Sequence, residues 1–158
     1  MTEAPRSAIR RAGASDAPAV AQLLHDFNTE YEDFTPGVGA LAERLAKLLA
    51  DGAIAVLLAG DNPPLGFALL RLRPSLWAKA EDAYLEELYV VPDRRGEGTG
   101  GALLDAAIEA ARQLGANHFE LTTGEDDRAA IALYESRSLT NREGAPDGPR
   151  MLYYELDL

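Results

Sequence analysis

Apolar residues in the early part of the chain recur every three or four positions, the spacing of one face of an α-helix. A short strand is expected before them, at residues 7–11. The apolar positions of the first predicted helix are Val20, Leu23, Leu24 and Phe27, and those of the second are Leu41, Leu45, Leu48 and Leu49. Both helices are therefore expected to bury one face and expose the other.

Continuous or alternating apolar runs in the middle of the chain predict strands. Residues 53–59 and 65–73 flank a turn rich in proline and asparagine, so they are expected to form a hairpin. Residues 84–91 predict a central strand. Strict alternation along it would place Glu86, Leu88 and Val90 on one face and Glu87, Tyr89 and Val91 on the other.

The last part of the chain alternates between helical and extended patterns. A third helix with an apolar stripe ends at Gly115, and a strand at residues 118–123 follows it. This strand should run parallel to the central one, because a helix connects them. A fourth helix is expected from a cap at residues 124–127 to about Ser136, and a final strand at residues 151–158. The pattern is that of a mixed α/β fold.

Composition narrows the classes of partner. The chain has 158 residues, so we expect one domain over residues 1–158. Its formal charge of −11 argues against nucleic acid and anionic membranes and leaves room for a cationic partner, although an acidic surface can also serve solubility alone. The absence of cysteine excludes disulfides and thiolate chemistry. No apolar run approaches the length of a membrane span, so a cytoplasmic protein is expected.

A glycine-rich turn lies between the central strand and the third helix. It contains Arg95 and, after it, Gly96, Gly98, Gly100 and Gly101. Such glycines allow positive φ angles and bring several backbone N–H groups toward one point, where the start of the helix adds the positive end of its dipole. The turn is therefore expected to hold an anion, most simply a pyrophosphate.

Two familiar phosphate-binding motifs fit this turn poorly. The spacing Gly96-x-Gly98-x-x-Gly101, with Glu120 further on, matches the dinucleotide fingerprint. However, residues 92–95 separate the strand from the first glycine, and too little chain remains for a dinucleotide-binding domain. A Walker loop is excluded because no Gly-Lys-Ser/Thr sequence ends the turn.

Two sequence elements resemble the GNAT superfamily of acyl-CoA-dependent N-acetyltransferases. The first is Arg95-x-x-Gly98-x-Gly100 after Val90-Val91-Pro92, and the second is Ala130-x-x-Leu133-Tyr134-Glu135 downstream. The stretches at residues 84–87 and 30–32 are similar to the diamine- and polyamine-acetylating branch. The resemblance implies a mixed, mostly antiparallel central sheet with splayed parallel strands in its middle and helices on both faces.

The resemblance also implies where acetyl-CoA binds as a cosubstrate. The pantetheine arm would lie between the splayed strands and pair with their backbone. The residues expected to contact the cofactor are Leu88, Val90, Arg95, Gly96, Glu97, Gly98, Thr99, Gly100, Gly101, Asp127 and Ala130. Asp127 stands where the family often has an asparagine, and Ser138-Leu139 stand where Gly-Phe is usual.

The chemistry requires a proton donor for the thiolate and a base for the amine. By resemblance, Tyr134 is the expected donor, with a core tyrosine as the alternative. Glu86 is the expected base, directly or through water, whereas Glu87 is expected to be solvated or paired with an arginine. His25 and His118 are expected to be structural. The residues predicted to contact the acceptor are Glu30, Tyr31 and Trp77.

The predicted function is acetyl transfer from acetyl-CoA to a small cationic primary amine, by direct attack in a ternary complex and without a metal. A homodimer is compatible with the resemblance. One alternative is a non-catalytic acyl-CoA-binding or sensor domain, which would need neither Tyr134 nor Glu86. Another is an acetyltransferase for protein or peptide amines.

Overall fold

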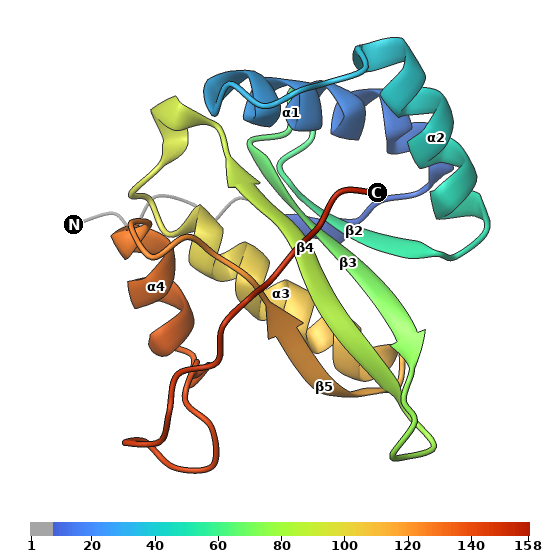
Figure 1. Ribbon diagram of the computed structural model, residues 1–158. Helices are drawn as coiled ribbons and strands as arrows, with labels where there is room; N and C mark the ends of the chain where they lie inside the picture. Colours follow the sequence, from blue (N-terminus) through green and yellow to red (C-terminus); the bar gives the residue numbers. More distant parts are fainter. Residues whose placement is uncertain (1–7) are drawn as a thin grey trace. The chain divides into compact units, whose positions relative to one another are not determined.

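The computed structural model describes residues 8–158, and its internal contacts divide the chain into two units, Met1–Leu121 and Thr122–Leu158 (Figure 1). The units are described one at a time. The single domain predicted from the length remains a prediction, and the predicted start of the first strand at Ser7 lies outside the described residues.

The first unit contains a five-stranded sheet in which spatial order follows chain order. Its first three pairings are antiparallel, and the last pairing is parallel. The strands are β1 (Ile9–Arg11), β2 (Ile54–Ala59), β3 (Gly66–Pro74), β4 (Glu81–Val90) and β5 (Ala116–Leu121). The mixed α/β class and the parallel direction of β5 are confirmed. The parallel pair lies at one edge of this sheet rather than in its middle.

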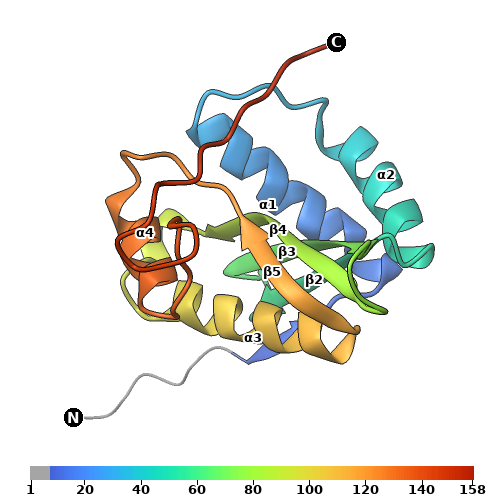
Figure 2. The same cartoon turned by 60° about the horizontal axis from the view of Figure 1, so that its bottom comes forward.

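Helices cover both faces of this sheet, as Figures 1 and 2 show. The helices of the first unit are α1 (Ala17–Glu30), α2 (Val38–Ala50) and α3 (Thr99–Gln113), with 3-10 turns η1 (Ala14–Asp16) and η2 (Pro92–Arg94). Val20 of α1 and Leu45 of α2 are buried in one core with Val56 and Phe67 of the sheet. The opposite face lies against α3, and β2 is buried along its whole length because both of its faces are covered. None of the described helices has both the length and the apolar character needed to cross a membrane.

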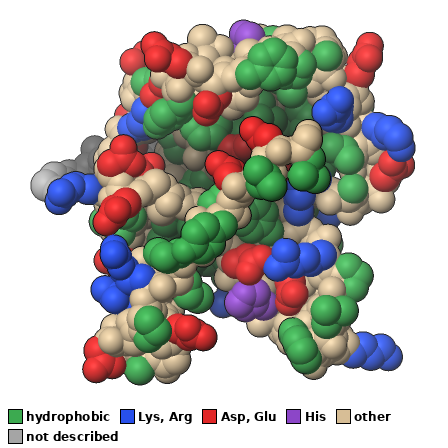
Figure 3. Space-filling view, in the orientation of Figure 1, with side chains coloured by type: hydrophobic (Ala, Val, Ile, Leu, Met, Phe, Trp, Pro, Cys, Tyr) green, Lys and Arg blue, Asp and Glu red, His purple; other side chains and the backbone are tan. Residues whose placement is uncertain are grey.

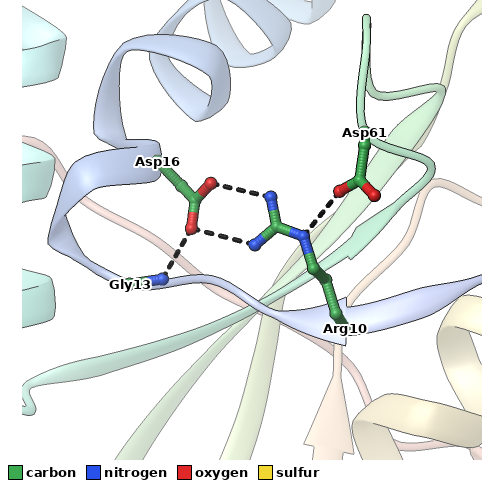
Figure 4. A network of polar contacts seen from close by, with 4 residues as sticks. All are labelled: Arg10, Gly13, Asp16 and Asp61. Atoms are coloured by element: carbon green, nitrogen blue, oxygen red, sulfur yellow. Dashed lines mark hydrogen bonds and ion pairs between the residues drawn. The ribbon is translucent and has the colours of Figure 1, made fainter.

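A charged network ties the first strand to the first helical turn (Figure 4). The Arg10 guanidinium donates two hydrogen bonds to the Asp16 carboxylate, at 2.8 and 3.0 Å, and one to Asp61 at 2.7 Å. The Gly13 N–H donates to Asp16 at 2.8 Å. The bonds from Arg10 and Gly13 lower the pKa of Asp16 to about 2. This network fixes β1, η1 and the β2–β3 turn relative to one another.

A β-bulge interrupts the alternation of β4. Leu85 pairs with Leu70, but the next β3 residue, Leu69, pairs with Glu87, so Glu86 is the extra residue. Residues opposite each other in an antiparallel pair point to the same face, so the side chains before and after Glu86 are out of step. The predicted alternation is therefore confirmed for Glu87, Tyr89 and Val91, which share a face, and wrong for Glu86, which does not share the face of Leu88 and Val90.

The strands β4 and β5 separate before β4 ends. Their last paired residues are Leu85 and Leu121, and β4 continues for another five residues, to Val90. The edge of β4 beyond Leu85 is therefore free of β5. This is the splay that the family resemblance implies.

The second unit contains α4 (Arg128–Glu135) and a long irregular segment after it. The predicted cap is confirmed, because the Asp127 carboxylate accepts the Ala130 N–H at 3.0 Å. The strand predicted at residues 151–158 is wrong. The one β-bridge outside the named strands of the described chain, Arg142 with Arg150, ends just before this segment. A strand needs a neighbouring strand for its backbone groups, and here an alternating apolar pattern lies exposed without one.

Candidate active site

The glycine-rich turn joins the end of β4 to the start of α3. Gly96 and Gly98 have φ angles of +78° and +86°, in the left-handed region that side-chain-bearing residues rarely adopt. A Cβ added to either would meet no atom within 4 Å, so conformation rather than crowding requires glycine here. Gly98 is the N-cap of α3 and provides no side-chain cap. The first N–H groups of α3 are thus suited to an anion such as a pyrophosphate.

The free edge of β4 presents backbone groups below this turn. Val91 donates its N–H to the Leu65 carbonyl at 2.9 Å, on the β3 side. Because backbone groups alternate along a strand, those of Val90 and Leu88 point toward the opposite side, where β5 no longer pairs. These are the two residues expected to pair with the pantetheine arm. The placement of Leu88 and of the Val90 N–H fits that role, whereas the Val90 carbonyl accepts a hydrogen bond from Arg95.

Arg95 and Glu30 bind each other. The Arg95 Nη1 and Nη2 groups donate to the two Glu30 carboxylate oxygens at 2.6 and 2.8 Å, and Nε donates to the Val90 carbonyl at 2.8 Å. The guanidinium also lies 5.5 Å from the centre of the Tyr89 ring. The ion pair lowers the pKa of Glu30. Sequence reasoning named both residues but assigned one to the cofactor and the other to the acceptor, because nothing in the sequence links positions so far apart.

The two adjacent carboxylates of β4 have different surroundings. Glu86 forms an ion pair with Arg71. Glu87 is half-buried, and burial, followed by the charges of Glu86 and Asp33, raises its pKa to about 7. An arginine partner was one of the two surroundings expected for Glu87, but the arginine, Arg71, pairs with Glu86 instead. Because Arg71 and Leu69 lie two residues apart on β3, the bulge brings both carboxylates to the same face.

The charge that acts on Glu87 from outside the sheet belongs to Asp33, in the loop after α1. Its N–H donates to the Asn28 carbonyl at 2.8 Å, and the Asn28 side chain donates to the Phe34 carbonyl at 2.8 Å, so the loop folds back on the helix end. The exposed fractions of Tyr31 and Phe34 are 55% and 85%. Sequence reasoning noted the acids of this segment but did not place Asp33 beside β4.

Comparison with known protein families shows to which family the chain belongs. A family model described as the acetyltransferase (GNAT) family matches residues 19–138. The chain belongs to the GNAT family of acetyltransferases. It is 32% identical to the uncharacterized N-acetyltransferase YhfO of Bacillus subtilis, covering 86% of this chain and 91% of that protein.

Two further relatives agree with the GNAT assignment. The thialysine N-epsilon-acetyltransferase of Sus scrofa is 28% identical, covering 86% of this chain and 87% of that protein. A crystal structure from Arthrobacter sp. FB24, of a protein described as an acetyltransferase, is 45% identical with a TM-score of 0.88 and complete coverage of both chains. The chain is thus similar to N-acetyltransferases over nearly its whole length.

Tyr134, the GNAT proton-donor candidate, lies on α4 in the second unit. It is half-buried, and burial, with a smaller effect of Asp127, raises its pKa. Its phenol therefore stays protonated at neutral pH, as a proton donor requires. Asp127 and Ala130 form the cap of this helix, and their contact with CoA remains a prediction.

The end of α4 departs from the GNAT pattern in sequence but keeps a similar geometry. Ser138 has a φ of +65°, in the left-handed region usually occupied by glycine after a helix. Leu139 donates its N–H to the Tyr134 carbonyl at 3.1 Å, which closes the helix end. The serine thus takes the glycine's conformation at some cost in strain.

Trp77 lies away from the glycine turn, and the two histidines have hydroxyl or carboxylate neighbours within the first unit. Trp77 is 93% exposed at the tip of the β3–β4 hairpin, so the length of β4, about 30 Å, separates it from the glycine turn. The structure does not bring it together with Glu30 and Tyr31. His25 lies 3.2 Å from the Thr35 hydroxyl, and His118 lies 3.4 Å from the Glu120 carboxylate. Both positions are compatible with the structural roles expected for them.

Proposed function

We propose that this GNAT protein transfers the acetyl group of acetyl-CoA to a small cationic primary amine, by direct attack in a ternary complex. The observation that supports this most is the placement of Glu87. It lies next to Leu88 at the start of the free edge of β4, its pKa is raised to about 7, and two more carboxylates lie near it. GNAT acetyltransferases use acetyl-CoA, and the glycine turn offers the backbone N–H groups that its pyrophosphate requires.

An ammonium substrate must lose a proton before it can attack. With a pKa near that of lysine, only about one molecule in a thousand is neutral at physiological pH. A base works best when its own pKa lies near the working pH, and Glu87 meets this condition. We therefore assign the base role to Glu87 rather than to Glu86, whose carboxylate is engaged by Arg71.

The proposed reaction balances with groups of this chain. The amine proton passes to Glu87, directly or through water, and the amine nitrogen forms a bond to the acetyl carbon. The C–S bond of the thioester breaks, and the thiolate takes a proton from the Tyr134 hydroxyl. The acylated nitrogen then loses its second proton, which restores the Tyr134 hydroxyl through water, and Glu87 releases the first proton to solvent. Tyr134 and Glu87 are the two residues that this reaction needs and that a mere acyl-CoA binder would not.

Charge and relatedness support the cationic class of acceptor. The carboxylates of Asp33, Glu86 and Glu87 would stabilise an ammonium group, and the net charge of −11 would attract it over longer distances. Acidic side chains are spread over the face shown in Figure 3. One relative acts, by its name, on the N-epsilon amine of thialysine, which is a primary amine on a flexible side chain.

The test is the release of free CoA from acetyl-CoA in the presence of an amine panel. The panel contains diamines, polyamines, amino acids, aminoglycosides, a peptide with a free N-terminus and neutral amines. Cationic amines should react in preference, and Glu87→Gln should lower their turnover by about a hundredfold or more. Preference for neutral amines would contradict the acceptor class, and acetyl-CoA binding without any turnover would favour the sensor alternative.

A further inference from the structure

The ion pair between Glu30 and Arg95 joins the end of α1 to the glycine turn. Glu30 is the last residue of α1, and Arg95 follows η2 directly. We infer that this pair positions the acceptor side of the site: it holds the loop at residues 31–34 beside β4, so that Arg95 acts on amine binding rather than as a ligand of the pyrophosphate. The inference rests on the proposed function, because it assigns the acceptor to the face of β4 where the charge of Asp33 acts on Glu87.

Three of the five N–H donors of Arg95 are engaged, one on each nitrogen. A guanidinium has five N–H donors in a fixed planar fork. Here both of its terminal nitrogens bind the Glu30 carboxylate in a two-pronged pair, and Nε binds the Val90 carbonyl. The Glu30 charge also neutralises that of Arg95. A phosphate could form a two-pronged pair with the terminal nitrogens only by displacing Glu30, which already provides the geometry that an arginine prefers.

A row of aromatic rings continues from the ion pair to the loop. The Arg95 guanidinium lies over Tyr89, the Tyr89 ring lies 5.0 Å from that of Phe27, and the Phe27 ring meets Tyr31 edge-on at 5.2 Å. Tyr89 belongs to the core that α1 and α2 form with the sheet, and Phe27 packs against that core. Tyr31 is largely exposed. The pair and the rings together connect the turn to the first residue of the loop.

The loop itself has few other anchors. The backbone hydrogen bond of Asp33 and the side-chain hydrogen bond to Phe34 both lead to Asn28, in the last turn of α1. Glu32 has a φ of +58°, and Phe34 is 85% exposed. The position of Asp33 beside Glu87 therefore depends on how the end of α1 is fixed, and Arg95 is what fixes it to the turn.

The test compares Glu30→Gln, Arg95→Gln and the double variant with the wild-type protein. Amide hydrogen exchange at residues 28–35 of the free protein should become about tenfold faster in all three variants, while α3 keeps its protection. The KM for the best amine should rise by about tenfold, with the dissociation constant of CoA changed by less than about threefold. The double variant should be no worse than either single one, because each removes the same contact.

Two matched variants separate positioning from simple charge. Arg94→Gln removes an arginine of the same turn, whose partner is the local residue Glu97, and it should leave both exchange and KM unchanged. Arg95→Lys keeps the charge but cannot form the two-pronged pair, so it should resemble Arg95→Gln. If Arg95 bound phosphate instead, lysine would largely replace it, and CoA affinity would fall in Arg95→Gln while Glu30→Gln left it intact.

That last pattern would overturn the inference, and so would unchanged exchange at residues 28–35 in Glu30→Gln. The result does not depend on the proposed reaction. Hydrogen exchange and CoA calorimetry require no turnover, so they decide the role of the pair even if no amine in the panel reacts. Should Arg95→Gln fail to fold, Glu30→Gln and Arg95→Lys still provide the same comparison.

Discussion

Asp33, in the loop after α1, lies near enough to Glu87 on β4 for its charge to raise the pKa of the Glu87 carboxyl. Burial is the largest cause of the raised pKa and the Glu86 charge the second, and Asp33 adds a contribution from a loop in another part of the first unit. A loop residue that carries the same charge as the base and the opposite charge to the substrate can affect both steps. It favours binding of the ammonium group and makes Glu87 more basic.

The pH dependence of turnover should report this relationship. Glu87 acts as a base only when ionised, so activity should rise as pH increases through its pKa of about 7. Asp33→Asn removes one cause of the raised pKa, so the acid limb of the profile of kcat should move to lower pH. The measurement is the pH profile on the best acceptor. Glu43→Gln, an exposed carboxylate of α2, is the control for loss of charge, and a limb unmoved in Asp33→Asn would contradict the coupling.

Replacement of Gly98 should weaken CoA binding. Gly98→Ala forces a side-chain-bearing residue into the left-handed region, at a cost of about 1–2 kcal/mol, and places a methyl group at the proposed pyrophosphate site. Isothermal calorimetry with CoA should show a loss of affinity of at least about tenfold. Bulkier substitutions at Gly98 or Gly100, such as valine, should have larger effects.

Gly115 provides the matched control for Gly98. It has a φ of +92° just after the other end of α3, with open space around its missing Cβ. Gly115→Ala should lose a similar amount of stability and keep its CoA affinity. Equal losses of affinity in both variants would show that strain, rather than ligand approach, accounts for the effect of Gly98→Ala.

The network around Arg10 should contribute stability that disappears in acid. The folded-state pKa of Asp16 is about 2, below the usual value, so its contribution is complete above the unfolded-state pKa and is lost as pH falls from about 4 to about 2. Asp16→Asn should therefore lower the midpoint of urea unfolding at pH 6 by more than at pH 2.5. Asp61→Asn, which loses a single bond from Arg10, should have a smaller effect, and an equal deficit of Asp16→Asn at both pH values would refute the assignment.

Removal of the Tyr134 hydroxyl should slow the reaction and spare binding. Tyr134→Phe keeps the ring, so kcat should fall by roughly ten- to a thousandfold with CoA affinity nearly unchanged. Steady-state kinetics and calorimetry measure the two quantities. Tyr154→Phe, at an exposed position of the C-terminal segment, is the control. Wild-type turnover in Tyr134→Phe would assign the tyrosine to packing.

Periodicity was sufficient to locate most elements but not the contacts between them. Helical stripes such as Val20 to Phe27 predict α1 because burial on one face leaves a direct trace in the sequence. The strand predicted at residues 151–158 failed because alternation specifies only a preference, and a strand also needs a neighbour. No local pattern could reveal that Arg95 would bind Glu30, since that pair depends on how α1 packs on the sheet.

The β-bulge at Glu86 could not be predicted from the sequence either. Ala83, Leu85 and Tyr89 are all buried and all at odd positions, which is the pattern of a regular strand. Only the register with β3 shows that Leu85 and Tyr89 face opposite sides of the sheet. The surroundings expected for the two carboxylates are therefore reversed: Glu86 forms the ion pair with an arginine, and Glu87 has the raised pKa.

The extra residue at Glu86 gives β4 two phases. Before Glu86, the side chains at odd-numbered positions face α3. After it, the side chains at odd-numbered positions face α1 and the candidate site. Strict alternation of the same residues without the bulge would put Tyr89 on the face of Leu85, outside the α1 core, and would turn the Glu87 carboxylate toward α3. One extra residue is thus enough to let a single strand pack against a helix at its first end and present the proposed base at its other end.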